Sequence, residues 1–192
     1  MWTTMTQTPD TILAAGRRYL ALADSFEDCE PERDLLLALG PATAGSVGHQ
    51  RAVWLCWLAV RRVLEHWRCP VIGPVEDIRQ ALALVDRWLT GAPDLPLVEW
   101  ARACHVDDWC SGRSHRGGEQ EEYSFGVFGM VAALCRFAFN GGIWDGVEVL
   151  QSAMYADAPY REREFQSWLA TVALPAAYEL RQLRAEELKQ GF

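Results

Sequence analysis

The chain has 192 residues, half of them apolar, and its formal net charge of −8 argues against a nucleic-acid partner, which needs a clustered basic face. A chain of this length buries roughly 70% of its surface on folding, so one domain spanning residues 1–192 needs no disulfide framework, and its six cysteines are expected to be mostly reduced. The sequence has no run of about 18 apolar residues that would predict a membrane span, and its N-terminus lacks a secretory signal. We therefore expect a cytoplasmic protein with no membrane partner.

The N-terminal part predicts two helices after residues 1–7, which we expect to be disordered. Residues 8–10, Thr-Pro-Asp, supply a hydroxyl cap, a proline for the first helical position and an acid for the first turn. Apolar residues follow at three- and four-residue spacing, which is typical of an amphipathic surface helix. A second, short helix is predicted from Pro31 to Gly40.

The helix predicted over residues 46–67 is apolar on every side from Ala52 to Val60, which is typical of a helix surrounded by others. Its last two turns return to an amphipathic pattern, so we expect this end to emerge into solvent. The next helix, from Gly73 to Gly91, has the clearest three- and four-residue apolar spacing in the chain.

A further helix is predicted over residues 94–104, before a polar, glycine-containing main loop at 110–118. Residues 125–139 are the second run that is apolar on all sides. We expect this helix to lie against the earlier all-apolar helix in the middle of the fold. Gly126 and Gly129 are expected to allow a close approach there.

The C-terminal part predicts two more helices. One begins near Asp145, an expected cap, and the last opens at Pro159. Pro175 is expected to break the last helix into two collinear pieces, because its ring removes a main-chain donor. The sequence therefore predicts an all-α fold, a single globular array of about seven to eight helices around two buried central helices.

One group of residues has the side chains of a metal site: Cys104, His105, Cys110 and His115. Four such ligands could close a tetrahedral zinc site. Neighbouring residues on a helix point about 100° apart, so the first two do not easily reach the same ion. We predict no bound metal and no cofactor, and zinc binding by this group stays open as the alternative.

Carboxylates offer an enzymatic interpretation, because acids on helices can hold a magnesium ion, as in all-helical nucleotide pyrophosphatases. The acids in question are Asp107, Asp108, Glu119, Glu122, Asp145 and Glu148. Acids also favour helix N-termini, which is the interpretation that we prefer. The sequence has no Gly-rich phosphate loop, nucleophile elbow or two-His metal helix. We predict a protein that is not an enzyme, with a metal-dependent all-helical hydrolase as the alternative.

Residues 59–91 contain a helix with a Val-Leu pair near its end, then an acid and an arginine, an alanine, and a Trp-Leu-x-Gly ending. These positions are Val63, Leu64, Asp77, Arg79, Ala81, Trp88, Leu89 and Gly91. The stretch resembles the helical immunity proteins of bacterial polymorphic-toxin systems. The resemblance implies a non-enzymatic inhibitor that binds and neutralises a cognate toxin, and it supplies no catalytic residues.

An acidic and aromatic surface near residues 105–123 is the predicted partner-binding site. Its residues are Asp107, Asp108, Trp109, Glu119, Glu121 and Glu122. Aromatic side chains are common at protein interfaces, and a negative field steers a basic partner into contact. We therefore predict a bacterial immunity protein whose partner is another protein, such as a basic toxin. A helical scaffold or sensor domain is the remaining alternative.

Overall fold

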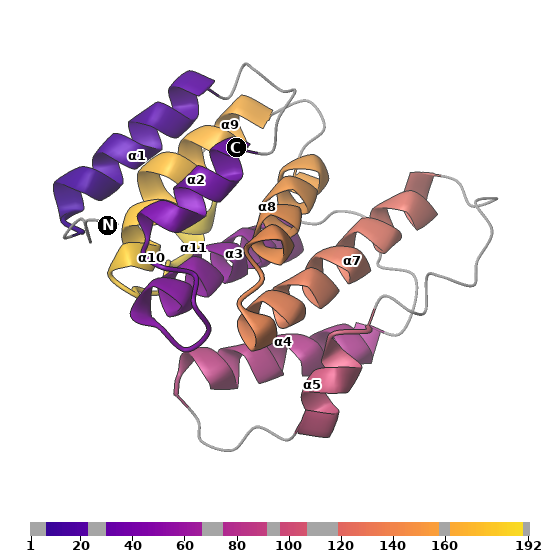
Figure 1. Cartoon of the computed structure of the whole chain (residues 1–192). Coiled ribbons are helices and arrows are strands. Elements are labelled where there is room, and N and C mark those ends of the chain that lie inside the picture. Colours follow the sequence, from indigo (N-terminus) through magenta and orange to yellow (C-terminus); the bar gives the residue numbers. More distant parts are fainter. Residues whose placement is uncertain are drawn as a thin grey trace.

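The computed structural model describes residues 7–22, 30–66, 75–91, 97–106, 119–157 and 162–189, without the side chains of residues 66, 119–125 and 157. These ranges contain helices and no strand, which confirms the predicted all-α fold (Figure 1). No helix within them is long and apolar enough to cross a membrane. The elements are α1 (Pro9–Leu22), α2 (Glu30–Ala38), α3 (Val47–His66), α4 (Val75–Leu89), α5 (Leu97–Ala103), α7 (Glu119–Asn140), α8 (Ile143–Asp157), α9 (Glu162–Trp168), the π-helical η1 (Leu169–Ala173), α10 (Leu174–Tyr178) and α11 (Ala185–Leu188).

The centre of the fold is built from α3 and α7, as their apolar runs predict. Every residue of α3 from Ala52 to Val60 is buried, and so is every residue of α7 from Met130 to Cys135. The two helices pack against each other, and α8 packs against both of them. The core therefore has α8 as a third member, because this helix follows directly on α7 and buries Val147, Val149, Leu150, Ala153 and Met154.

The close helix approaches are not where the sequence suggested. Within the described part of the chain, a Cβ added at Gly126 or Gly129 would meet nothing within 4 Å, so the expected role of these two residues is wrong. A close approach between helices occurs instead at Gly16, where a Cβ would lie 2.8 Å from the carbonyl oxygen of Ala170, and Gly48 of α3 meets the turn after α2, where its Cβ would lie 2.6 Å from Gly40 Cα. Periodicity shows which helix face is buried but not which turn meets a neighbouring backbone.

The end of α3 differs from its predicted emergence into solvent. Arg61 and Glu65 are partly exposed and form an ion pair of 2.8 Å, but Arg62 is only 1% exposed. Its guanidinium lies 4.6 Å from the ring centroid of Trp168 and donates to the carbonyl oxygen of Leu188 at 3.0 Å. The C-terminal segment thus covers a residue type that the sequence pattern assigned to the surface.

Two further expectations are corrected at helix ends. Helix α8 begins at Ile143, so Asp145 lies in its first turn and is not its cap. The irregularity expected from Pro175 takes the form of the π-helical turn η1 just before it, one of the ways a helix accommodates a proline. Of residues 1–7, which the sequence predicts to be disordered, the structure describes only Gln7, whose carbonyl oxygen accepts a hydrogen bond from Tyr178 at 3.0 Å. Pro159 and the predicted loop at 110–118 lie outside the described residues.

Candidate protein-interaction groove between α4 and α5

Helices α4 and α5 pack together at one end of the molecule, away from α1 and α9 (Figure 1). The apolar face of α4 buries Ile78, Leu84 and Val85. The shorter α5 is anchored by Trp100, which is 3% exposed and stacks on Phe139 of α7 with 5.8 Å between the ring centroids. The two helices are thus both anchored in the core, and their outer surfaces lie next to each other.

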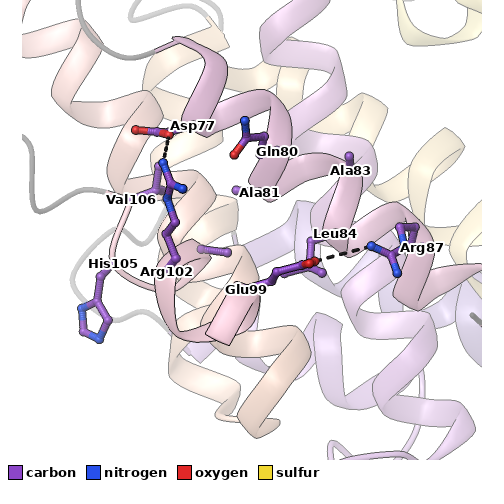
Figure 2. A pocket seen from close by; sticks show the side chains of 11 residues that line it. Asp77, Gln80, Ala81, Ala83, Leu84, Arg87, Glu99, Arg102, His105 and Val106 are labelled. Atoms are coloured by element: carbon purple, nitrogen blue, oxygen red, sulfur yellow. Dashed lines mark hydrogen bonds and ion pairs between the residues drawn. The ribbon is translucent and has the colours of Figure 1, made fainter. Parts of the chain in front are cut away.

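A groove of about 610 Å³ lies between the two helices (Figure 2). Its walls include three alanines, Ala81, Ala83 and Ala103, whose small side chains leave the space open. Leu84 and Val106 add apolar surface, and charged side chains stand around it. A volume of this size is in the range of pockets that bind ligands or anchor side chains of a partner protein. The remaining lining residues are Asp77, Gln80, Arg87, Glu99, Arg102 and His105.

Two ion pairs join α4 to α5, one toward each end of the groove. Asp77 accepts from Arg102 at 2.6 Å, and Glu99 accepts from Arg87 at 3.5 Å (Figure 2). The side chain of Arg102 is 70% exposed, and surface ion pairs of this kind contribute at most about 1 kcal/mol. Both pairs can therefore open at small cost when charged groups of another molecule approach.

Beside the groove, α5 carries uncovered apolar side chains. Leu97 is 71% exposed and Val98 is 80% exposed. They lie on the same short helix as Glu99 and Arg102, so apolar and charged contacts are available side by side. Such a mixture is typical of protein interfaces.

The predicted partner-binding residues lie largely outside the part of the chain whose side chains the structure describes. Asp107, Asp108 and Trp109 lie outside the described residues, and Glu119, Glu121 and Glu122 form the first turn of α7 without described side chains. The groove nevertheless adjoins this segment in the chain, because His105 and Val106 line the groove and directly precede Asp107. Helix α7 contacts α4 through Cys135 and α5 through Phe139, both near its C-terminal end and not near Glu119.

The group with zinc-ligand residue types is only half described, since Cys110 and His115 lie outside the described residues. Cys104 is 7% exposed, and burial raises the pKa of its thiol, which disfavours the thiolate that a metal requires. The imidazole of His105 is directed away from the Asp77–Arg102 pair (Figure 2). Among the side chains that the structure describes, no three of His, Cys, Asp or Glu are placed to share a metal ion.

Two carboxylates of the hydrolase alternative are brought together, but by an arginine. Arg136 on α7 donates from Nε to Asp145 at 2.9 Å and from Nη2 to Glu148 at 3.2 Å. Its Nη1 also lies 3.4 Å from the carbonyl oxygen of Cys104. Arg136 therefore joins α7 to α8 through the two acids and to the end of α5 through Cys104, and a metal ion would have to displace its guanidinium to use the acids.

Sequence reasoning missed the groove itself. The signal was that in each of two consecutive helices an acid precedes an arginine, Asp77 then Arg87 on α4 and Glu99 then Arg102 on α5. In an antiparallel pair of helices this order places each acid near an arginine. Alanines such as Ala83 on the exposed side of α4 were the second signal, because they leave space between the helices.

Comparison of the chain with protein-family models, curated proteins and solved structures returned no match in any of the three.

Proposed function

We propose that this chain is a non-enzymatic cytoplasmic binding protein of the immunity type, which holds a basic protein partner at the α4–α5 groove. The observation that carries the proposal is the groove of about 610 Å³ whose last lining residues, His105 and Val106, run directly into the acids Asp107 and Asp108. The residues that line the groove and the acids that would attract a basic partner are thus adjacent in the chain.

The groove supports a protein partner because it combines anchoring space with adjustable charges. The open space would receive a side chain of the partner, while Leu97 and Val98 would be covered at the rim. Asp77 and Glu99 could exchange their exposed intramolecular arginines for cationic groups of the partner with little loss, since each resident pair is weak.

The partner's charge is inferred from the whole chain. A net charge of −8 attracts a cationic surface over a distance of about one Debye length. The stretch that resembles helical immunity proteins, residues 59–91, includes all of α4 and therefore one wall of the groove. A toxin with a basic surface, such as a nuclease, fits both features.

The proposal is tested by filling the groove. Ala83 is exposed and lines it, so Ala83→Trp places a large ring in the open space without entering the core. We expect this variant to bind the product of the neighbouring gene at least about ten-fold more weakly than the parent, because the space that anchors the partner is occupied. Binding is measured by surface plasmon resonance, and protection by the growth of cells that express both proteins.

Ala14→Trp is the matched control, since Ala14 is an exposed alanine on α1, remote from the groove. It should bind and protect like the parent. Unchanged binding by the Ala83 variant would move the interface elsewhere. Failure of the parent to bind that product, together with magnesium-dependent hydrolysis of a nucleotide by the parent, would replace this proposal with the hydrolase.

A further inference from the structure

The C-terminal segment is held in the fold by hydrogen bonds to its main chain. We call residues 179–189 the C-terminal strap. Trp54 donates from its indole nitrogen to the carbonyl oxygen of Arg181 at 3.1 Å, and Trp168 donates likewise to Glu187 at 2.9 Å. Arg62 donates to the carbonyl oxygen of Leu188 at 3.0 Å. These three donors, on α3 and α9, bind main-chain carbonyl oxygens of the strap and not its side chains. We call Trp54, Arg62 and Trp168 the cradle.

The strap is a self-contained unit. Only Leu183 and Leu188 are buried, at 4% and 0% exposure, and its other side chains are partly or fully exposed. Its charged contacts are largely internal: Arg181 pairs with Glu187 at 3.0 Å, and the main-chain nitrogen of Arg184 donates to Glu187 at 2.9 Å. The strap can therefore leave the cradle and keep most of its own structure.

The local sequence conflicts with the path that the strap takes. From Tyr178 to Lys189 the residues are Tyr-Glu-Leu-Arg-Gln-Leu-Arg-Ala-Glu-Glu-Leu-Lys, without glycine or proline, and most of them favour a continuous helix. The chain instead ends α10 and turns back at Leu180, whose φ of 53° is in the left-handed region. Arg181 donates to Ala176 at 2.8 Å, the long-range bond of a Schellman turn, in which glycine usually occupies the position of Leu180.

The backbone at Leu180 can thus adopt two states. In the folded-back state the cradle contacts hold the strap and the strain at Leu180 is retained. In an extended state α10 continues through Leu180 and the strain there is released, while residues 181–189 keep the structure that fits the cradle. Extension alone uncovers Leu183, Leu188 and the cradle, so it is favourable only when another strap fills the cradle.

From this geometry we infer that two copies of the chain exchange their C-terminal straps, each strap occupying the cradle of the other copy through a helical hinge at Leu180. The contacts of strap and cradle are the same in the monomer and in the exchanged dimer, so the dimer loses none of them. At both hinges, the exchanged dimer is free of the backbone strain that the monomer retains at Leu180. The occupant is a second copy because the cradle is already complementary to this segment.

The hinge is tested with Leu180→Ala and Leu180→Gly in the full chain. Both remove the same half-buried side chain, but alanine favours the extended helix whereas glycine tolerates the left-handed turn. The preference of alanine over glycine for a helix favours the extended state about five-fold per hinge. With two hinges, the dissociation constant of the alanine variant's dimer should be about 25-fold lower than that of the glycine variant. Sedimentation over micromolar to millimolar protein concentrations measures the two dissociation constants, and circular dichroism checks that both variants are folded.

Exchange is distinguished from ordinary association by mixing isotope-labelled and unlabelled chains. In the dimer, magnetisation should pass between chains from the indole N–H of Trp168 to Glu187 and Leu188, which are neighbours across the cradle. Equal dissociation constants for the two variants, monomers alone up to millimolar concentration, or a dimer without this contact between chains would each overturn the inference. The test is independent of the α4–α5 groove.

Discussion

Gly16 on α1 lies so close to Ala170 of η1 that a Cβ at position 16 would sit 2.8 Å from the carbonyl oxygen of Ala170. Helix α1 packs against η1 at this point, and Ile12 and Tyr19, one turn to either side, are buried in the same contact face. The missing side chain is therefore what lets the two backbones meet.

The first prediction compares two glycines in helices. Gly16→Ala should lower the free energy of unfolding by about 1 to 3 kcal/mol, because the new methyl group pushes α1 away from a backbone that cannot yield. Gly129→Ala should raise it by about 0.5 to 1 kcal/mol, because no described atom crowds the position and alanine favours a helix. Urea unfolding at pH 7.5 measures both. A Gly16 variant as stable as the parent would mean that α1 does not approach η1 this closely.

The second prediction concerns the buried Arg62. Arg62→Ala should lower the free energy of unfolding by about 2 to 4 kcal/mol, because it removes the hydrogen bond to Leu188 and the contact over the Trp168 ring. Arg62→Lys should lie between the alanine variant and the parent, since an ammonium retains the charge but not the planar fork. Chemical denaturation gives the order.

Arg79→Ala is the control for this series. Arg79 is an exposed arginine paired with Glu76 at 3.6 Å, and its removal should change stability by less than about 0.5 kcal/mol. If Arg62→Ala had an effect as small as the control, the covering of Arg62 by the C-terminal segment would be refuted.

The third prediction is a pH dependence that arises from His49. This fully buried imidazole packs edge-on against Trp88 and Phe137, with 5.3 Å between its ring centroid and each of theirs. Its Nδ1 accepts from the Gly45 nitrogen at 3.2 Å, and its Nε2 donates to the Phe137 carbonyl oxygen at 2.8 Å, so both nitrogens are used in the neutral ring. Burial lowers the pKa of His49, although the bond to Phe137 opposes the shift.

A lowered pKa in the folded state means that protonation favours unfolding. The contribution of His49 to stability is complete above the unfolded-state pKa of about 6.5, and it is lost as the pH falls through the folded-state pKa. The free energy of unfolding should decrease as the pH falls below about 6.5, with a slope that approaches about 1.4 kcal/mol per pH unit between the unfolded-state and folded-state pKa values. Urea titrations at pH 7.5, 6.5 and 5.5 follow this decrease, and His49→Gln should show a flatter profile. An equal slope in both proteins would assign the pH dependence to other groups.

The fourth prediction concerns the acids among residues 107–122, which follow the groove-lining Val106 in the chain. Changing Asp107 and Asp108 to Asn, and Glu121 and Glu122 to Gln, should leave the melting temperature nearly unchanged and slow association with the basic partner. The difference from the parent should shrink as salt rises, because screening weakens steering. Binding kinetics at two salt concentrations give the on-rates.

The matched control neutralises four exposed acids elsewhere: Asp10, Glu30, Glu164 and Glu186. This control changes the net charge equally, so a slower on-rate only in the first variant would locate the steering field near the groove. Equal on-rates for the two variants would leave only the net charge as the cause, and the predicted site at residues 107–122 would be wrong.

The sequence by itself determined which segments form helices and, for α4 and the central parts of α3 and α7, which residues are buried. The runs around Ala52 to Val60 and Met130 to Cys135 carry apolar residues on all sides, and this property alone requires that they be surrounded. The clean spacing of α4 likewise predicted its buried face. These features depend on residues one or two turns apart, so a linear pattern records them.

Only the tertiary structure decided the features that join distant segments. The α4–α5 groove depends on how Asp77 meets Arg102, and the burial of Arg62 depends on Leu188, more than a hundred residues away in the chain. The turn at Leu180 even opposes the local helix preference, because contacts with the cradle outweigh it. Helix periodicity reports which face is buried, but the identity of what buries it comes from packing between segments, which no local pattern contains.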